Sequence, residues 1–220
     1  MNSLPVTDRT RIRRLPERQR TERDELFGIL DEALVVHVAL DRGGQPVLLP
    51  MGFGRDDNYI YLHGSTGGGM FRQLANGAPV AIAATHLDGL VFARSLFDSS
   101  MNYRSAVIFG VPEVVSDASA KEAALMIVSE HLMPGRWDEV RPMTKRELAA
   151  TLVVRVPLDE ASVKVRAHGA SEEPDDGENR EVWAGVVPLS VVAAQPERSE
   201  LTPVDVAAPA SVVRAAASRR

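Results

Sequence analysis

Residues 34–62 read LVVHVALDRGGQPVLLPMGFGRDDNYIYL, and this stretch decides the expected fold. Two apolar runs, Leu34–Leu40 and Gln45–Phe53, flank the turn-forming residues Asp41-Arg42-Gly43-Gly44, which is the pattern of a β-hairpin. A second turn over Gly54–Asn58 leads into a third run, Tyr59–Leu62. Consecutive strands joined by turns this short can only pair antiparallel, so the stretch predicts an antiparallel sheet.

More strands than helices are expected in the rest of the chain. The further strands are predicted over Ala78–Thr85, Gly89–Arg94, Tyr103–Val115, Thr151–Pro157, Ser162–Ala167 and Val182–Leu189. Helices are predicted over Pro16–Asp31, over a short stretch that ends at Gly77, over Ser116–Leu132, and after the capping box Thr144–Glu147. Many short strands with few helices indicate a mainly β fold, an antiparallel barrel with flanking helices.

Composition restricts the class of protein and its organisation. The 220 residues carry a formal net charge of −5, which argues against a nucleic-acid partner, and contain no cysteine, which excludes disulfides and thiolate zinc sites. No apolar run is long enough to span a membrane, so a cytoplasmic protein is expected. We expect a basic N-terminal arm over residues 1–14, one domain over 15–193, and a disordered tail rich in alanine and proline over 194–220.

The arginines near the N-terminus allow two interpretations. Arg9–Arg14 reads RTRIRR, and Arg18, Arg20 and Arg23 follow. A run of this kind could bind a polyanion, although such runs are more often solvated arms and helix faces.

Residues 62–77, LHGSTGGGMFRQLANG, form a glycine-rich loop between a strand and a short helix. The loop matches only the first half of a nucleotide-binding P-loop, because Met70 and Phe71 stand where lysine and a hydroxyl are needed. A phosphate could still bind to the amides that open the helix, helped by Ser65, Thr66 and Arg72. The alternative is a flexible turn without a ligand.

Two further groups of polar residues are candidates for a site. The five histidines, at positions 37, 63, 86, 131 and 168, show no paired metal-ligand spacing, but His63 ends a strand at the mouth of the glycine loop. Asn102–Ser105 place an amide, a phenol, a guanidinium and a hydroxyl at the start of an otherwise apolar strand. Such groups need either a ligand or capping partners within the protein.

Several of these stretches occur together in one known family. LHGS with its glycine loop is followed by THLDGLVFARS (85–95), SMNYRS (100–105), HLMPGRW (131–137) and VWAGVVPL (182–189). In this order they resemble the pyridoxamine 5′-phosphate oxidase-like FMN-binding split-barrel proteins, specifically the nitroimidazole-resistance branch. The resemblance covers about residues 15–190.

The resemblance implies a fold, a cofactor and a set of site residues. It implies a six-stranded antiparallel split barrel with flanking helices and a homodimer that binds FMN at the subunit interface. His63 and Tyr103 are the catalytic candidates, as proton donors. The residues expected to contact the cofactor are Leu49, Pro50, Met51, Gly52, Phe53, His63, Gly64, Ser65, Thr66, Gly68, Gly69, Met70, Arg72, Asn102, Tyr103, Arg104, Ser105 and Trp183.

Three functions remain open at this point. The first is a flavin-dependent oxidoreductase that reduces nitro-aromatic or related small molecules, with FMN or a deazaflavin. The second is a haem-binding protein, in which His63, His37 or His86 would be the axial ligand. The third is a non-catalytic flavin-binding regulator. Oxidation of vitamin B6 is not expected, since the chain lacks the arginine and lysine set of the true oxidases.

Overall fold

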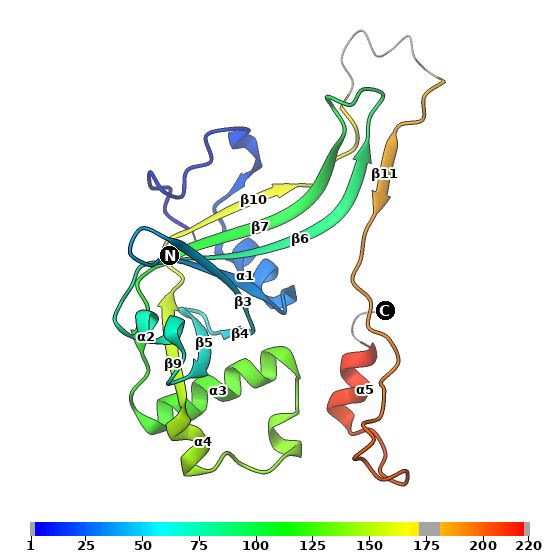
Figure 1. The fold of residues 1–220 in the computed structure, drawn as a ribbon. Coiled ribbons are helices and arrows are strands. Elements are labelled where there is room, and N and C mark those ends of the chain that lie inside the picture. The colour runs from blue at the N-terminus through cyan, green and yellow to red at the C-terminus, as the bar shows by residue number, and fades with distance from the viewer. Residues whose placement is uncertain (1–2, 172–180, 218–220) are drawn as a thin grey trace. The chain divides into compact units, whose positions relative to one another are not determined.

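The structure is a computed structural model that describes residues 3–171 and 181–217 (Figure 1). The expected fold class, mainly β with antiparallel sheets and flanking helices, is confirmed. The chain divides into two compact units, each of three segments. The first unit comprises residues 1–33, 83–108 and 159–190, and the second comprises residues 34–82, 109–158 and 191–220.

The first unit is built on one antiparallel sheet. Its strand order is β1-β10-β7-β6, and β11 pairs with the last four residues of β6. The strands are β1 (Gln19–Arg20), β6 (Val80–Phe92), β7 (Ser100–Gly110), β10 (Ala161–Arg166) and β11 (Gly185–Pro188). The helices of this unit are the 3₁₀ helix η1 (Pro16–Arg18) and α1 (Arg23–Glu32). Helix α1 buries Leu26, Ile29 and Leu30 on one face, as its apolar spacing predicts.

The second unit contains a hairpin and a four-stranded sheet. Strands β2 (Val36–Asp41) and β3 (Pro46–Met51) form the predicted hairpin, and Gly43 and Gly44 adopt positive φ in its turn. The four-stranded sheet has the order β4-β5-β9-β8, formed by β4 (Phe53–Arg55), β5 (Tyr59–Ser65), β9 (Thr151–Pro157) and β8 (Glu113–Val114). Its helices are α2 (Gly69–Ala75), α3 (Ala118–Leu132), η2 (Trp137–Glu139), α4 (Lys145–Ala150) and α5 (Ala210–Ala217).

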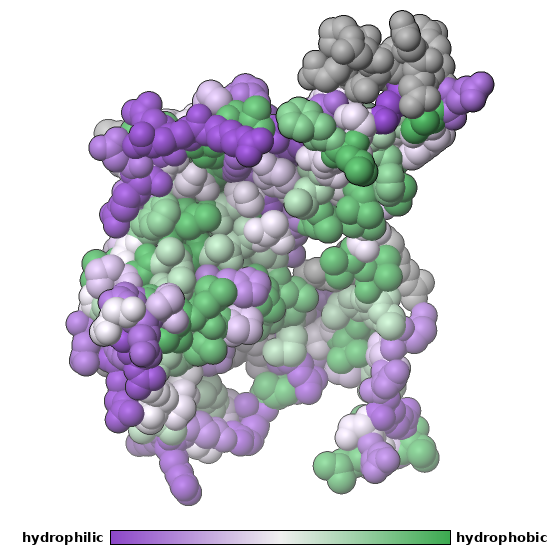
Figure 2. Space-filling view, turned by 45° about the horizontal axis from the view of Figure 1, so that its top comes forward, coloured by the Kyte–Doolittle hydropathy of each residue, from purple (hydrophilic) through white to green (hydrophobic). Residues whose placement is uncertain are grey.

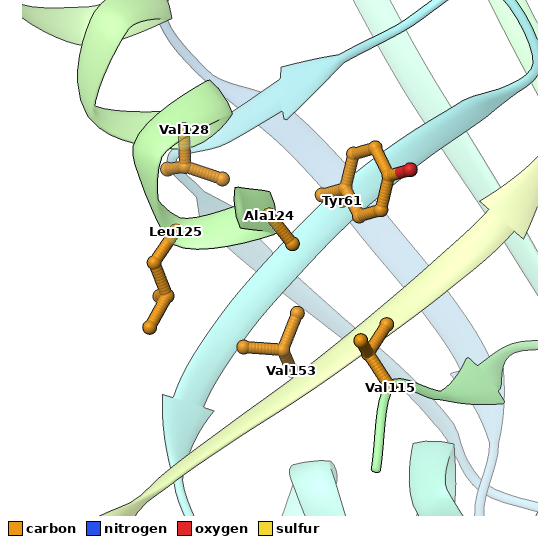
Figure 3. Packing of buried hydrophobic residues seen from close by; sticks show 6 residues of the cluster. All are labelled: Tyr61, Val115, Ala124, Leu125, Val128 and Val153. Carbon is orange, nitrogen blue, oxygen red and sulfur yellow. The ribbon is translucent and has the colours of Figure 1, made fainter. Parts of the chain in front are cut away.

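Helix α3 covers one face of the four-stranded sheet (Figure 3). Ala124, Leu125 and Val128 point from the helix toward Tyr61 of β5 and Val153 of β9. Asp117 caps the helix by accepting the backbone N–H of Ala120 at 2.8 Å, as the sequence predicts. A side chain at Gly54 would overlap the backbone of α3 at Val128, so this glycine lets the helix approach β4 closely.

Three expected elements differ in the structure. The helix expected over Pro16–Asp31 is interrupted, because Gln19–Arg20 pairs with β10, and it becomes η1, β1 and α1. Two strands expected over Ala78–Thr85 and Gly89–Arg94 are one strand, β6. Its Gly89 lies where the backbone of β11 approaches, so this glycine marks a close strand contact and not a turn.

The two ends of the chain also carry more structure than expected. The tail expected to be disordered from residue 194 contains helix α5, which is rich in alanine, the strongest helix former. In the expected basic arm, Leu4 and Thr10 are buried, and Arg9 pairs with Glu160. The arm interpreted as solvated is therefore packed against the first unit at these points.

Candidate functional site

The loop between β5 and α2 is organised by its own backbone. Ser65 ends β5, its hydroxyl accepts the amide of Gly67 at 3.3 Å, and its carbonyl accepts the amide of Gly68 at 3.0 Å. Thr66 donates its amide to the carbonyl of Ala150 at 3.1 Å, which ties the loop to the end of α4. Gly68 caps α2 without a side-chain acceptor, so the first amides of this helix have no partner within it.

The glycines in and beside the loop differ in what a side chain at their position would contact. A side chain at Gly64 would overlap the ring of Phe71, so close packing requires this glycine. A Cβ at Gly69 would meet nothing within 4 Å, and a Cβ at Gly67 only the Ser65 hydroxyl at 3.8 Å. None of these glycines has a positive φ. Gly67 and Gly69 therefore leave an open space beside the loop, which a side chain would reduce.

His63 lies on the same face of the sheet as the start of the loop. In the β5–β9 register His63 is opposite Val153 and Ser65 is opposite Thr151. Side chains alternate along a strand, so His63, Ser65 and Thr151 share one face. The imidazole is exposed, yet the surrounding protein desolvates it and lowers its pKa below the ordinary value. A larger share of this histidine is therefore neutral near pH 7.

A cavity of about 640 Å³ lies next to this loop. Its walls are formed by Val140, Arg141, Met143, Glu147, Ala150 and Thr151. It adjoins the loop because Ala150 accepts the Thr66 amide and Thr151 is the strand partner of Ser65. Such a volume falls within the usual range for ligand pockets. Arg141 and Glu147 form an ion pair at 2.6 Å on the exposed side, while the aliphatic side chains supply an apolar wall.

The donors around the loop suit an anionic phosphate. Ser65 and Thr66 carry exposed hydroxyls, and Arg72 is exposed and makes no ion pair with any residue that the structure describes. The open space at Gly67 and Gly69 lets a ligand reach the amides that open α2. These residues fit the phosphate of a flavin nucleotide.

The expected cofactor contacts over Leu49–Phe53 lie in two environments. Leu49 and Pro50 are exposed on β3, and Met51 and Gly52 are partly exposed. Phe53 is fully buried, and its ring centroid is 4.5 Å from that of His131. Phe53 therefore packs in the core of the second unit, which differs from the expectation that it runs beside a cofactor ring.

The polar residues at the start of β7 have partners within the first unit. Arg104 makes paired hydrogen bonds to Glu32, both at 2.8 Å, and to Asp88, at 2.9 and 3.0 Å. These carboxylates raise the pKa of Arg104 further above its ordinary value. The Ser105 hydroxyl donates to the Lys164 carbonyl at 3.3 Å. Capping and ion pairing thus account for Arg104 and Ser105.

Asn102 and Tyr103 differ in what they contact. The Asn102 side-chain oxygen accepts hydrogen bonds from Arg166 and from the amide of His168. The phenol of Tyr103 makes no hydrogen bond within residues 3–171 and 181–217. Tyr103 belongs to the first unit and His63 to the second. The two expected catalytic residues therefore belong to different compact units.

Trp183, expected to pack against the cofactor, is 65% exposed in the first unit. Its ring centroid is 6.1 Å from that of Phe92, the last residue of β6.

The sequence carried no sign of the cavity walls over residues 140–151. The capping box at Thr144 and Glu147 was recognised as a helix signal, but the pattern carries no sign that Glu147 would also hold Arg141.

The structure also bears on metal and membrane sites. Over residues 3–171 and 181–217, no three histidine or acidic side chains gather in a way that could hold a metal ion. Among the same residues, no helix combines the length and the apolar character needed to cross a membrane.

Comparison with known proteins identifies the class. A family profile described as pyridoxamine 5′-phosphate oxidase matches residues 22–165, more than half of the chain. No curated protein sequence matches this chain. The chain is 40% identical to a solved structure described as the FAD and haem binding protein from Mycobacterium smegmatis, with a TM-score of 0.85, over 89% of this chain and 96% of that one.

Two other solved structures are informative. One is described as the flavocytochrome Anf3 from Azotobacter vinelandii, with 32% identity, a TM-score of 0.88, and coverage of 94% of this chain and 96% of that one. The other is described as a candidate 5-nitroimidazole antibiotic resistance protein from Bacteroides thetaiotaomicron, with 25% identity, a TM-score of 0.58, and coverage of 67% and 86%. The chain belongs to the pyridoxamine 5′-phosphate oxidase family, and the expected split-barrel resemblance is confirmed.

Proposed function

We propose that this protein is a flavin-binding oxidoreductase that also binds a haem. The observation that carries the proposal is the 40% identity, over 89% of the chain, to a protein described as binding FAD and haem. A second relative described as a flavocytochrome supports the same combination. The glycine loop and the adjoining cavity are where we place the two ligands.

The loop residues would hold the phosphate of the flavin. Ser65 and Thr66 would donate hydroxyl hydrogen bonds, Arg72 would supply a positive charge, and Gly67 and Gly69 would leave room for the ligand. The flavin would supply hydride and single-electron transfer. FMN stays our prediction for the nucleotide, although the Mycobacterium smegmatis relative is described as binding FAD. A deazaflavin is the other alternative.

His63 would bind the iron of the haem. Iron binds the neutral imidazole, and the lowered pKa of His63 favours that form near pH 7. The adjoining cavity of about 640 Å³, with its wall of Val140 and Met143, suits a large apolar ring. His86 is a weaker candidate because its Nε2 is 2.9 Å from the carbonyl of Ile29.

An absorption spectrum of the purified protein tests the proposal. We expect flavin bands together with a haem Soret band, and we expect the His63→Ala variant to lose the Soret band while it keeps the flavin. The parallel variant His37→Ala tests the other exposed strand histidine of the second unit that the sequence allows as a haem ligand, and we expect it to keep the Soret band. A colourless protein that takes up neither added flavin nor added haem would contradict the proposal.

Reduction of a nitro-aromatic compound is a second candidate activity. The 25% identity to a candidate 5-nitroimidazole resistance protein favours it. In that case His63 or Tyr103 would donate protons to the substrate. Nitroreductase turnover that falls in His63→Gln and in Tyr103→Phe would support this role. A protein that binds flavin but turns over no acceptor would instead favour the non-catalytic regulator.

We also propose a homodimer, with the flavin near the subunit interface. Large apolar side chains are exposed in the first unit, including Leu90, Phe92, Trp183 and Val187. Figure 2 shows several separate apolar areas, in green, on the face that it presents. Light scattering should give a mass of two chains. A cytoplasmic location stays a prediction, which cell fractionation would test.

A further inference from the structure

Arg166 is a buried arginine at the end of β10. Only 2% of its surface is exposed, although it falls on the opposite face of the strand from the buried residues Ala161 and Val163. The N-terminal segment contributes to its burial, because Gln19 pairs with Lys164 in the strand register and the Lys164 ammonium donates to the Arg14 carbonyl at 3.3 Å.

The hydrogen bonds of the Arg166 guanidinium all go to neutral oxygens. Nη1 donates to the side-chain oxygen of Asn102 and to the carbonyl of His168 at 2.9 Å, and Nη2 donates to the carbonyl of Gly169 at 3.1 Å. The buried Nε has no hydrogen-bond partner. Within residues 3–171 and 181–217, no carboxylate pairs with this arginine. Arg166 is thus a buried cation without a counter-charge in the described structure.

A second arginine adds to the positive charge at this place. Arg18, the last residue of η1, has a side chain that is 19% exposed, and its Nε is also buried without a hydrogen bond. Its only ion pair among the described residues is a 3.7 Å contact with the exposed Glu17. Arg18 directly precedes Gln19, the strand partner of Lys164, so it lies beside the end of β10 that carries Arg166. Burial lowers the pKa of Arg166 and the charge of Arg18 lowers it further, whereas Tyr103, the strand partner of Arg166 on β7, acts in the opposite direction.

This arrangement is unfavourable unless an anion joins it. Arginine stays protonated at all ordinary pH values, so it cannot avoid the cost of burial by losing its proton. Buried charges in proteins are normally paired, and two neighbouring like charges add repulsion to the cost of desolvation. An anion between the two groups would satisfy the unpartnered N–H donors and remove the repulsion.

We infer that Arg18 and Arg166 form a binding site for an oxyanion, a phosphate or carboxylate group carried by a ligand. The planar N–H fork of arginine matches both of these groups with paired hydrogen bonds. The site lies in the first unit, and neither arginine belongs to the expected flavin or haem contacts, although Asn102, one of those contacts, is a hydrogen-bond partner of Arg166. A nucleotide phosphate and an organic carboxylate are the two sources that the experiment separates.

The site also gives the basic N-terminal sequence a more specific role. Arg9 is paired with Glu160 on the protein, and Arg23 contacts Asp159 at 3.7 Å. Arg18 differs from these two because its Nε is buried without a hydrogen bond, its carboxylate contact being the 3.7 Å ion pair with Glu17. The sequence pattern allowed a polyanion partner for the whole run, whereas the structure singles out Arg18, which lies beside the end of β10 that carries Arg166.

Thermal unfolding of the full chain in different anions tests the site. Inorganic phosphate, malonate and chloride are compared at equal ionic strength, using the native chain and the Arg18→Gln, Arg166→Gln and Arg13→Gln variants. Arg13 is exposed, so its variant changes the net charge equally without touching the site. At ten times the dissociation constant, phosphate or malonate should raise the Tm of the native chain by about 4 °C relative to chloride.

The variants decide whether that rise belongs to the site. Arg18→Gln and Arg166→Gln should lose it, and Arg13→Gln should keep it; if Arg166→Gln does not fold, Arg18→Gln alone is decisive. A larger rise with phosphate would identify a phosphate ligand, and a larger rise with malonate a carboxylate ligand. No rise above chloride, a rise that survives in Arg18→Gln, or an equal loss in Arg13→Gln would overturn the inference. Because the probes are inorganic phosphate and malonate, failure here leaves the flavin and haem proposal untouched.

Discussion

Gly64, near the end of β5, and Gly69, the first residue of α2, lie five residues apart in very different surroundings. A methyl group at Gly64 would overlap the buried Phe71 ring, whereas a methyl group at Gly69 would meet nothing within 4 Å. We expect Gly64→Ala to lower the free energy of unfolding by about 1–3 kcal/mol through overpacking. Gly69→Ala should leave stability unchanged or raise it by up to about 1 kcal/mol, since alanine favours helix. Urea denaturation measures both effects.

The same pair of variants tests what the loop binds. Gly69→Ala should reduce the flavin retained after purification, because the added methyl group fills the space beside the helix-opening amides. The flavin-to-protein absorbance ratio measures retention independently of stability. If Gly69→Ala keeps the native amount of flavin, the loop does not hold the phosphate.

Residue by residue, the sequence identified part of the candidate site. The strand-to-helix position of Ser65 and Thr66 was readable because glycine and hydroxyl residues mark such turns. The environment of Phe53 was not readable, since an apolar residue next to a glycine can face either side of a sheet. Arg166 gave no signal either. Its burial depends on chain segments far away in sequence.

Helix α4 forms one wall of the cavity, and its first turn is held by a capping box. Thr144 accepts the amide of Glu147 at 3.2 Å, and Glu147 accepts the amide of Thr144 at 2.7 Å. We expect Thr144→Ala to lower the free energy of unfolding by about 1 kcal/mol, the usual cost of losing an N-cap. Urea denaturation would show this loss, and Thr144→Ser should restore the native value.

Glu147 gives the same helix a defined pH dependence. The hydrogen bond from Arg141, with those from Thr144, lowers the pKa of Glu147 to about 2. A carboxylate with a lowered pKa stabilises the fold fully at pH values above its ordinary pKa of 4.5. This contribution is lost as the pH falls toward about 2. Thermal unfolding between these limits should show a smaller pH dependence in Glu147→Gln. An identical slope in native chain and variant would contradict the assignment.

Helix α5 is attached to the second unit through its first turn. Ser211 is buried, its amide donates to the Glu139 carboxylate at 2.9 Å, and its hydroxyl donates to the same carboxylate. We expect Ser211→Ala to speed hydrogen exchange of the amides in residues 210–217, because the helix loses the hydrogen bond from the Ser211 hydroxyl to the Glu139 carboxylate. Ser190→Ala, at an exposed position, should leave that exchange unchanged. Unaltered protection in Ser211→Ala would show that the contact does not hold the helix.

At the level of elements, local signals were predictive and tertiary ones were not. The hairpin turn at Gly43-Gly44, the Asp117 cap of α3 and the capping box of α4 are all encoded in a few neighbouring residues. The short strand β1 and the continuous strand β6 depend on partners far along the chain, namely β10 and β11. No periodicity within the segment can reveal such partners.

The molecule as a whole should be stabilised by its proposed flavin. A ligand that binds only the folded chain adds about 2.7 kcal/mol at a hundred times its dissociation constant, which corresponds to a Tm rise of about 8 °C for a chain of this size. FMN or FAD should produce this rise in flavin-free protein. Riboflavin, which lacks the phosphate, should produce much less. Equal rises with riboflavin and FMN would exclude a role for the phosphate.

The division into two units also explains what sequence could not supply. Each unit combines three separate segments of the chain, and β6 and β7 contribute residues to both. A single domain over residues 15–193 stays a prediction, because segments that are close in space but far apart in sequence leave no boundary signal. Residue patterns indicated a mainly β antiparallel barrel, and the family resemblance specified it as a split barrel.

The positions of the two tryptophans provide a way to observe each unit separately. Trp137 packs against the α3 cluster of the second unit, while Trp183 is 65% exposed next to Phe92 in the first. Their fluorescence should differ in colour, the exposed indole emitting further to the red. Replacing either one with phenylalanine leaves a single emitter. Energy transfer from that emitter to a bound coloured cofactor would then give the distance from the cofactor to each unit in solution.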